Sequence, residues 1–75
     1  MTATSMKFVI CIGNQGYEAS LEPLKVYRSL VDPVAEKHRQ LRVIDESGED
    51  YLFPSRHFMA IELTPPVRRA ILAAL

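Results

Sequence analysis

Short blocks of hydrophobic residues, most of them the length of a β-strand, alternate with polar segments along this chain. A continuous apolar run at Lys7–Ile12 ends at a glycine-rich turn and is too short for a helix, so it predicts a buried strand. A weaker alternation predicts a second strand at Lys25–Leu30. Two runs rich in β-branched, aromatic and leucine residues, Leu41–Asp45 and Asp50–Phe53, flank a turn that contains a glycine and predict a β-hairpin. A last strand is expected at Met59–Leu63.

The connections between these strands are expected to be short and irregular. Pro23 argues against a regular central strand within Tyr17–Leu24. We therefore expect a loop there, with the side chains of Leu21 and Leu24 turned inward. The segment Ser55–Phe58 has about the length of a single 3₁₀ turn.

A short helix is predicted after the second strand. Asp32 is suited to the N-cap, Pro33 to the first helical position, and Glu36 adds a carboxylate to the first turn. The helix is expected at about residues 33–40, which gives it at most two turns. Because so short a helix is marginal in isolation, it is expected to lean on the strands or to serve as a long connection between them.

A second helix is predicted at the end of the chain, over residues 64–75. Thr64 is suited to its N-cap and a proline follows early in the first turn. Apolar residues recur at three- and four-residue spacing and form a stripe of Val67, Ala70, Ile71, Ala74 and Leu75. This stripe is expected to dock either on the protein's own strands or on a partner subunit, with Val67, Ile71 and Leu75 as the candidate interface residues; fraying is the remaining alternative.

The order of the strands, the loop, the hairpin and the 3₁₀ turn resembles the SH3-like barrel. The segment Leu52–Phe58 (LFPSRHF) is similar to the SH3 segment Leu-Phe-Pro-Ser-Asn-Tyr-Val. The whole chain also resembles a group of small bacterial proteins that carry the segments YEASLE and RVIDESGEDYL, a resemblance that implies a fold and no function. We therefore expect a mainly β protein. It would have a leader at residues 1–5 and a five-stranded SH3-like barrel at residues 6–63, with the short inserted helix and the short C-terminal helix.

The residues that would form an SH3 peptide groove are only partly present. An SH3 groove binds polyproline segments between flat aromatic walls, and this chain contains no tryptophan. The loop at residues 17–24 is also shorter than the corresponding SH3 loop. The resemblance leaves Tyr17, Leu52, Pro54 and His57 as groove candidates. Proline-motif recognition of the SH3 kind is therefore disfavoured.

Length, charge and cysteine content limit the number of domains, the kinds of binding partner and the cellular location that are expected. Seventy-five residues make one domain, which buries only about 60% of its unfolded surface. Nine basic and nine acidic residues cancel, which disfavours binding of nucleic acid by charge alone. Cys11 is the only cysteine and is expected to be a small buried hydrophobe. No signal peptide or membrane-spanning stretch is found in the sequence, so a cytoplasmic location is the default expectation.

No motif in the sequence indicates an enzyme, a metal site or a cofactor site. The four carboxylates around the hairpin turn lack the spacing of an EF-hand loop and are expected to be solvated. Cys11 and His57 could act as nucleophile and base only if the fold joined them, and no third residue supports this. The segment Gly13–Gly16 lacks the lysine and the helix of a phosphate-binding loop.

Two classes of function therefore remain. The first is a protein-interaction module that binds an unknown partner protein or a second copy of itself. Its candidate binding face is formed by Tyr17, Tyr51, Leu52, Pro54 and His57, to which Phe58 could add. The alternative for Tyr51, Phe53 and Phe58 is a place in the core. The second class is nucleic-acid binding, which would require the arginines to converge on one surface: Arg39, Arg42, Arg56, Arg68 and Arg69.

Overall fold

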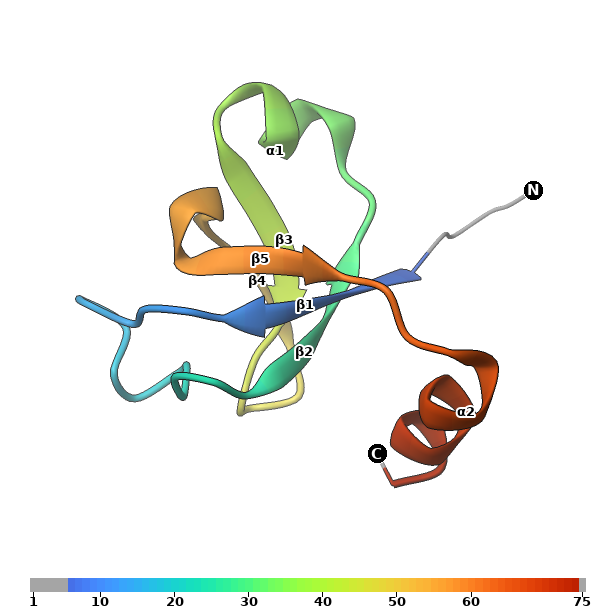
Figure 1. The fold of residues 1–75 in the computed structure, drawn as a ribbon. Helices are drawn as coiled ribbons and strands as arrows, with labels where there is room; N and C mark the ends of the chain where they lie inside the picture. Colours follow the sequence, from blue (N-terminus) through green and yellow to red (C-terminus); the bar gives the residue numbers. More distant parts are fainter. Residues whose placement is uncertain (1–5, 75) are drawn as a thin grey trace.

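The computed structural model describes residues 6–74, which form a five-stranded antiparallel sheet with two short α-helices and one 3₁₀ turn (Figure 1). In chain order the elements are β1 (Met6–Cys11), β2 (Val26–Leu30), α1 (Pro33–Lys37), β3 (Gln40–Ile44), β4 (Asp50–Pro54), η1 (Ser55–His57), β5 (Phe58–Ile61) and α2 (Pro65–Ala74). The mainly β prediction is confirmed. The predicted leader at residues 1–5 lies outside the described residues.

The strand order is β4-β3-β2-β1-β5. The first four strands follow one another as an antiparallel meander, and β5 returns to the opposite side of β1, where Cys11 lies opposite Phe58. The two predicted hairpin segments pair as expected, and in the observed register Leu41 lies opposite Phe53 and Ile44 opposite Asp50. Within residues 6–74 no strand pairing joins β4 to β5, so hydrogen bonds do not close the sheet.

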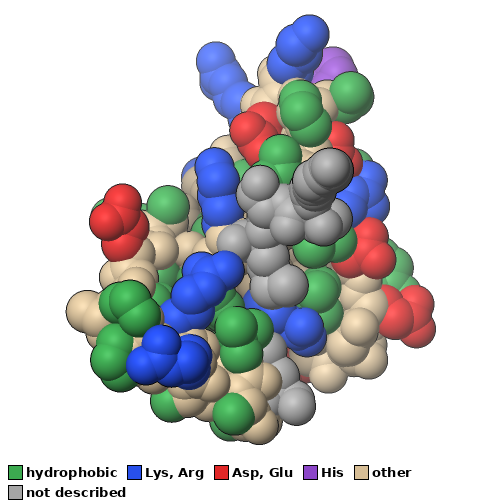
Figure 2. Space-filling view, turned by 90° about the vertical axis from the view of Figure 1, so that its right-hand side faces the viewer, with side chains coloured by type: hydrophobic (Ala, Val, Ile, Leu, Met, Phe, Trp, Pro, Cys, Tyr) green, Lys and Arg blue, Asp and Glu red, His purple; other side chains and the backbone are tan. Residues whose placement is uncertain are grey.

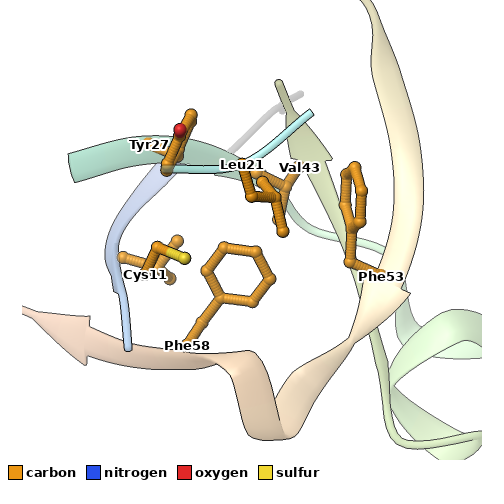
Figure 3. Packing of buried hydrophobic residues seen from close by; sticks show 7 residues of the cluster. Cys11, Leu21, Tyr27, Val43, Phe53 and Phe58 are labelled. Carbon is orange, nitrogen blue, oxygen red and sulfur yellow. The ribbon is translucent and has the colours of Figure 1, made fainter. Parts of the chain in front are cut away.

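The core lies on one face of this curved sheet (Figure 3). Successive side chains of a strand point to opposite faces, so Val9 and Cys11 project from β1 to the same side. The aromatic rings meet edge to face, with centroids 6.2 Å apart for Phe53 and Phe58. Cys11 is fully buried, as predicted. The whole cluster consists of Val9, Cys11, Leu21, Tyr27, Val43, Phe53 and Phe58.

The loop between β1 and β2 contributes one of its two leucines to the core. Leu21 is buried, as expected, and packs among the strand residues (Figure 3). The prediction for Leu24 is wrong, because its side chain is 77% exposed. Leu24 adopts a left-handed φ of 66°, and its N–H donates to the carbonyl of Cys11. This reversal brings the chain back beside β1 and turns the Leu24 side chain outward.

The helix α1 begins as predicted and ends earlier. The carboxylate of Asp32 accepts a hydrogen bond of 3.1 Å from the N–H of Ala35, as an N-cap does. The helix ends at Lys37 rather than at residue 40. Arg39 has a left-handed φ of 59°, which breaks the helix, and its carbonyl accepts from the N–H of Ser55. The next residue already belongs to β3.

The C-terminal helix α2 follows β5 (Figure 1). It has ten residues and no buried side chain. Of the predicted interface residues, Val67 is 47% exposed, Ile71 is half-buried and Leu75 lies outside the described residues. The guanidinium of Arg68 lies 5.0 Å from the centre of the Phe8 ring, which anchors the helix beside β1. The apolar stripe is thus only partly covered by the protein's own strands. No helix in residues 6–74 has the length and apolar character needed to span a membrane.

Candidate functional site

A groove lies between the β1–β2 loop and the β3–β4 hairpin. It has a volume of about 370 Å³ and is open to solvent. Three of the five residues predicted for the binding face line it: Tyr17 from the loop, and Tyr51 and Leu52 from β4. The complete lining consists of Tyr17, Ser20, Asp45, Ser47, Tyr51, Leu52 and Phe53. We call this surface the tyrosine groove.

Tyr17 belongs both to the groove and to the core. Its carbonyl accepts the N–H groups of Ser20 and Leu21, both at 2.9 Å, which fixes a tight turn at this point of the loop. Its ring meets Phe53 edge-on at 5.3 Å and His57 at 5.8 Å. The side chain is half-buried and packs on the core cluster. Because its ring is held on two sides, Tyr17 forms a rigid wall of the groove.

Tyr51 and Leu52 form the exposed wall of the groove. Their exposed fractions are 49% and 38%, so neither is a core residue. The Tyr51 hydroxyl donates a hydrogen bond of 3.3 Å to Glu49, and the negative charge of that carboxylate raises the pKa of Tyr51. Phe53, one residue further on, is buried in the core as expected. β4 thus exposes its first half beside the groove and buries its second half.

Asp45 lies at the bottom of the groove and holds the hairpin turn. It is buried, and its carboxylate accepts from the N–H of Ser47 at 2.8 Å and from the hydroxyl of Ser47 at 2.5 Å. Gly48 has a φ of 85°, the left-handed conformation that glycine adopts without a steric penalty, and its N–H donates to the carbonyl of Asp45. The expectation that all four turn carboxylates are solvated is therefore wrong for Asp45.

The other three turn carboxylates lie at the surface, and each has a hydrogen-bond partner. Glu49 accepts from Tyr51, Asp50 accepts from Arg42, and Glu46 accepts from the Lys25 amine. Among the described residues, no group of three or more His, Cys, Asp or Glu side chains is arranged to hold a metal ion.

A network around Glu46 fixes the two sides of the groove relative to each other. The buried Tyr27 hydroxyl donates to Glu46, and the Lys25 amine forms an ion pair with the same carboxylate at 2.7 Å. The Glu46 N–H donates to the carbonyl of Ser20, and the N–H of Glu22 donates to the Tyr27 hydroxyl. Burial, followed by the bond to Glu46, raises the pKa of Tyr27 well above its ordinary value. The bonds from Lys25 and Tyr27 lower the pKa of Glu46.

The remaining two residues of the predicted face do not line the groove. Pro54 is half-buried at the end of β4, where it lies opposite Gln40. His57 lies beneath the surface, only 5% exposed, with the Tyr17 ring against it. Within residues 6–74 its Nε2 atom has no hydrogen-bond partner. The thiol of Cys11 donates to the carbonyl of Gly13, so this sulfur has a structural partner of its own.

The sequence analysis did not predict three of the groove residues as part of the binding face: Ser20, Asp45 and Ser47. For two of them a signal was present, because Asp-x-Ser before a glycine is typical of a turn in which the aspartate side chain bonds the backbone two residues on. That pattern predicts an inward-pointing Asp45. Nothing in the local sequence marks Ser20, which reaches the groove through the turn that Tyr17 begins.

The five arginines considered for nucleic-acid binding belong to different elements and connections of the fold. Arg42 is held by two carboxylates, with its guanidinium 2.8 Å from Asp32 and 3.1 Å from Asp50. The Ala35 N–H and this arginine lower the pKa of Asp32. The others lie in the turn between α1 and β3, in η1 and in α2: Arg39, Arg56, Arg68 and Arg69. The charge of Arg42 is thus already balanced within the fold.

Comparison of the chain with protein-family models, with curated proteins and with solved structures finds no match. The geometry of the tyrosine groove is therefore the basis for a functional conclusion.

Proposed function

We propose that this protein is a small interaction module, built as an SH3-like barrel, that binds a segment of a partner protein in the tyrosine groove. One observation carries the proposal. Tyr17 from the β1–β2 loop meets Tyr51 and Leu52, two neighbouring residues of β4, at one solvent-open groove. Exposed aromatic and aliphatic side chains gathered in this way are typical of protein-binding surfaces.

The strand order supports the SH3-like assignment. A four-stranded antiparallel meander is followed by a 3₁₀ turn, and the last strand then pairs with the first. In such a barrel, η1 would lie at the gap between β4 and β5. The match of the segment at Leu52–Phe58 to the SH3 pattern falls on this same stretch.

The rigidity of the groove favours binding. Tyr17 is held by Phe53 and His57, and the Glu46 network ties the hairpin to the loop. A side chain that is fixed before binding loses little conformational entropy when a partner docks, so more of the contact energy appears as affinity. The groove thus resembles a preformed binding surface.

The charge around the groove selects the kind of partner. Glu46, Glu49 and Asp50 are exposed in the hairpin beside it, and Glu49 is the one of the three that forms no ion pair within residues 6–74. Carboxylates at the rim of an interface favour partners that carry basic residues and repel acidic ones. The preferred partner is therefore a segment that combines apolar side chains with lysine or arginine.

We also propose that the protein is located in the cytoplasm. Cys11 is a free, buried cysteine, and cysteines are kept reduced in that compartment.

Selection from a displayed peptide library on the immobilised full chain tests this function. The expected result is a set of peptides that combine apolar and basic residues and that shift the NMR signals of Tyr17, Tyr51 and Leu52. Tyr51→Ala is expected to weaken their binding at least tenfold. Val34→Ser is the matched control, because Val34 is 67% exposed on α1 and distant from the groove lining. Peptides that bind both variants equally would contradict the proposal.

A further inference from the structure

The helix α2 exposes apolar side chains that residues 6–74 cover only in part. Val67 and Leu72 are 47% and 40% exposed, and no side chain of this helix is buried. Figure 2 shows hydrophobic side chains at the surface in the lower part of the face on which α2 lies, next to Lys and Arg side chains. A ten-residue helix is marginal in water without packing, so this exposed surface is suited to a second contact.

The charge of α2 is complementary to the charge around the tyrosine groove. The helix contains Arg68 and Arg69 and no acidic residue, whereas Glu49 in the hairpin beside the groove is exposed and forms no ion pair within residues 6–74. Arg68 lies over the Phe8 ring, while Arg69 is exposed. The helix therefore combines apolar and basic side chains, which is the chemistry that the groove favours in a partner.

The groove and α2 lie on two sides of the same hairpin turn. Asp45 lines the tyrosine groove and also a second hollow of about 180 Å³. The lining of this second hollow includes Phe8, Ile44 and, from α2, Ile71. In Figure 1 the turn (yellow) lies between the β1–β2 loop (cyan) and α2 (red). The two complementary surfaces are thus adjacent on one molecule, and a twofold axis near the turn could exchange them between two molecules.

We propose that the groove is occupied by a second copy of this chain, with α2 of each copy lying in the tyrosine groove of the other. This inference rests on the proposed function of the groove as a protein-binding site. The apolar contact is Leu72, which shares a face of the helix with Arg69, against the tyrosines. The polar contact pairs Arg69 with Glu49, whose carboxylate lies beside the Tyr51 hydroxyl at the rim. A reciprocal exchange forms each contact twice and so doubles the buried area.

Sedimentation equilibrium of the full chain over a range of concentrations, combined with charge reversal, tests the exchange. The wild-type protein is expected to be a dimer. Arg69→Glu alone and Glu49→Arg alone are each expected to weaken the dimer at least tenfold, since each places two like-charge pairs in the interface. Both positions are exposed, so folding is expected to be retained, and circular dichroism checks this.

The equimolar mixture of the two variants is the decisive sample. In a mixed dimer, Glu at position 69 faces Arg at position 49 on one side, and the native pair forms on the other side, so dimerisation is expected to recover. Lys37→Glu, an exposed charge reversal on α1, is the control and is expected to leave the dimer intact. Leu72→Ser tests the apolar contact without a charge change and is expected to weaken the dimer.

A wild-type protein that stays monomeric, a dimer unaffected by both charge reversals, or a mixture that does not recover would each overturn the exchange. None of these results contradicts the proposed function if displayed peptides still bind the groove and lose affinity on Tyr51→Ala. Failure of the peptide selection together with a dimer that Tyr51→Ala does not weaken would remove both proposals. The two experiments therefore separate a groove that binds other proteins from a groove that binds this chain.

Discussion

The hydroxyl of Tyr27 lies 2.5 Å from Oε2 of Glu46, so β2 and the β3–β4 turn are joined by a short hydrogen bond at the edge of the core. Tyr27 is 5% exposed, and its hydroxyl also accepts the N–H of Glu22 in the loop. This one oxygen therefore connects β2 to the hairpin and to the loop, and the hairpin and the loop border the tyrosine groove.

Tyr27→Phe is expected to lower the free energy of unfolding by about 1–3 kcal/mol, because Glu46 loses a donor and the N–H of Glu22 loses an acceptor. Urea titration near neutral pH measures the change. Tyr51→Phe removes a hydroxyl from an exposed tyrosine and is the control, with an expected change within about 0.5 kcal/mol. Equal effects of the two substitutions would show that the Tyr27 bond contributes little.

The same tyrosine is expected to make the free energy of unfolding depend on pH in the alkaline range. The pKa of Tyr27 is raised in the folded protein, above the ordinary value of 10.0. The unfolded chain therefore releases this proton first, and the free energy of unfolding is expected to fall as the pH rises above about 10. The Lys25 amine, whose pKa is raised by Glu46, adds a decline of the same sign. Melting temperatures at about pH 8 and about pH 11 are expected to differ less for Tyr27→Phe than for the wild type.

Asp32→Asn is expected to separate two contributions of this residue to stability, the N-cap of α1 and the ion pair with Arg42. Asparagine can still cap the helix, whereas the charge that binds Arg42 is lost. The pKa of Asp32 is lowered from 3.8, first by the Ala35 N–H and then by Arg42, so its contribution to stability is present above that value and is lost as the pH falls below it. The variant is therefore expected to melt lower near neutral pH and to show a weaker dependence on acid.

Thermal melting between about pH 6 and about pH 3 measures this difference. Glu36→Gln removes an exposed charge from the same helix without breaking the cap or the ion pair, and its melting curve is expected to follow that of the wild type. If the two variants have the same acid dependence, the Asp32–Arg42 pair does not contribute to stability.

Leu21→Ala is expected to lower the free energy of unfolding by about 2–5 kcal/mol, because Leu21 is 1% exposed and the truncation leaves a cavity in the core. That is a large part of the total stability of a domain of this size, so partial unfolding at room temperature is expected. Leu24→Ala is the matched control in the same loop. Leu24 is 77% exposed, and its truncation is expected to change stability by less than about 0.5 kcal/mol. Similar losses at both positions would contradict the placement of the loop.

His57→Phe is expected to raise the melting temperature or leave it unchanged. His57 is buried between Tyr17 and the core, and its Nε2 has no hydrogen-bond partner in residues 6–74. A buried polar atom without a partner costs free energy, and an apolar ring of similar size removes that cost. Differential scanning calorimetry measures the shift. A clear drop in melting temperature would contradict this expectation.

The sequence predicted those parts of the fold that depend on local patterns. The cap at Asp32, the β-hairpin and the 3₁₀ turn follow from residue types that favour one backbone conformation, and all three are found. The side-chain direction of Leu24 could not be predicted, because it depends on a chain reversal that pairs this loop with β1. The early end of α1 has the same cause, since the left-handed Arg39 is held by a contact with Ser55.

For the candidate site, the sequence analysis identified the exposed wall of the groove, but it could not predict which of the other candidate side chains are buried. Tyr51 and Leu52 lie at the surface, as a binding face requires, whereas His57 lies beneath the ring of Tyr17. Whether a residue next to a 3₁₀ turn points inward or outward depends on what the distant loop places over it. Glu46 also looked like an ordinary surface carboxylate, because its partner Tyr27 lies 19 residues away in the sequence.

The position of β5 has a consequence for the order of folding. β1 to β4 are each joined to the next strand by a nearby turn or loop, whereas β5 must pair with β1 from the far end of the sheet. Closing a long loop costs more entropy than closing a hairpin, so contacts between sequence-distant segments generally form late. The β3–β4 hairpin is expected to form early, and the docking of Phe58 against Cys11 to complete the native state. Substitutions in β5 should therefore act mainly on the unfolding rate, and substitutions in the hairpin mainly on the folding rate.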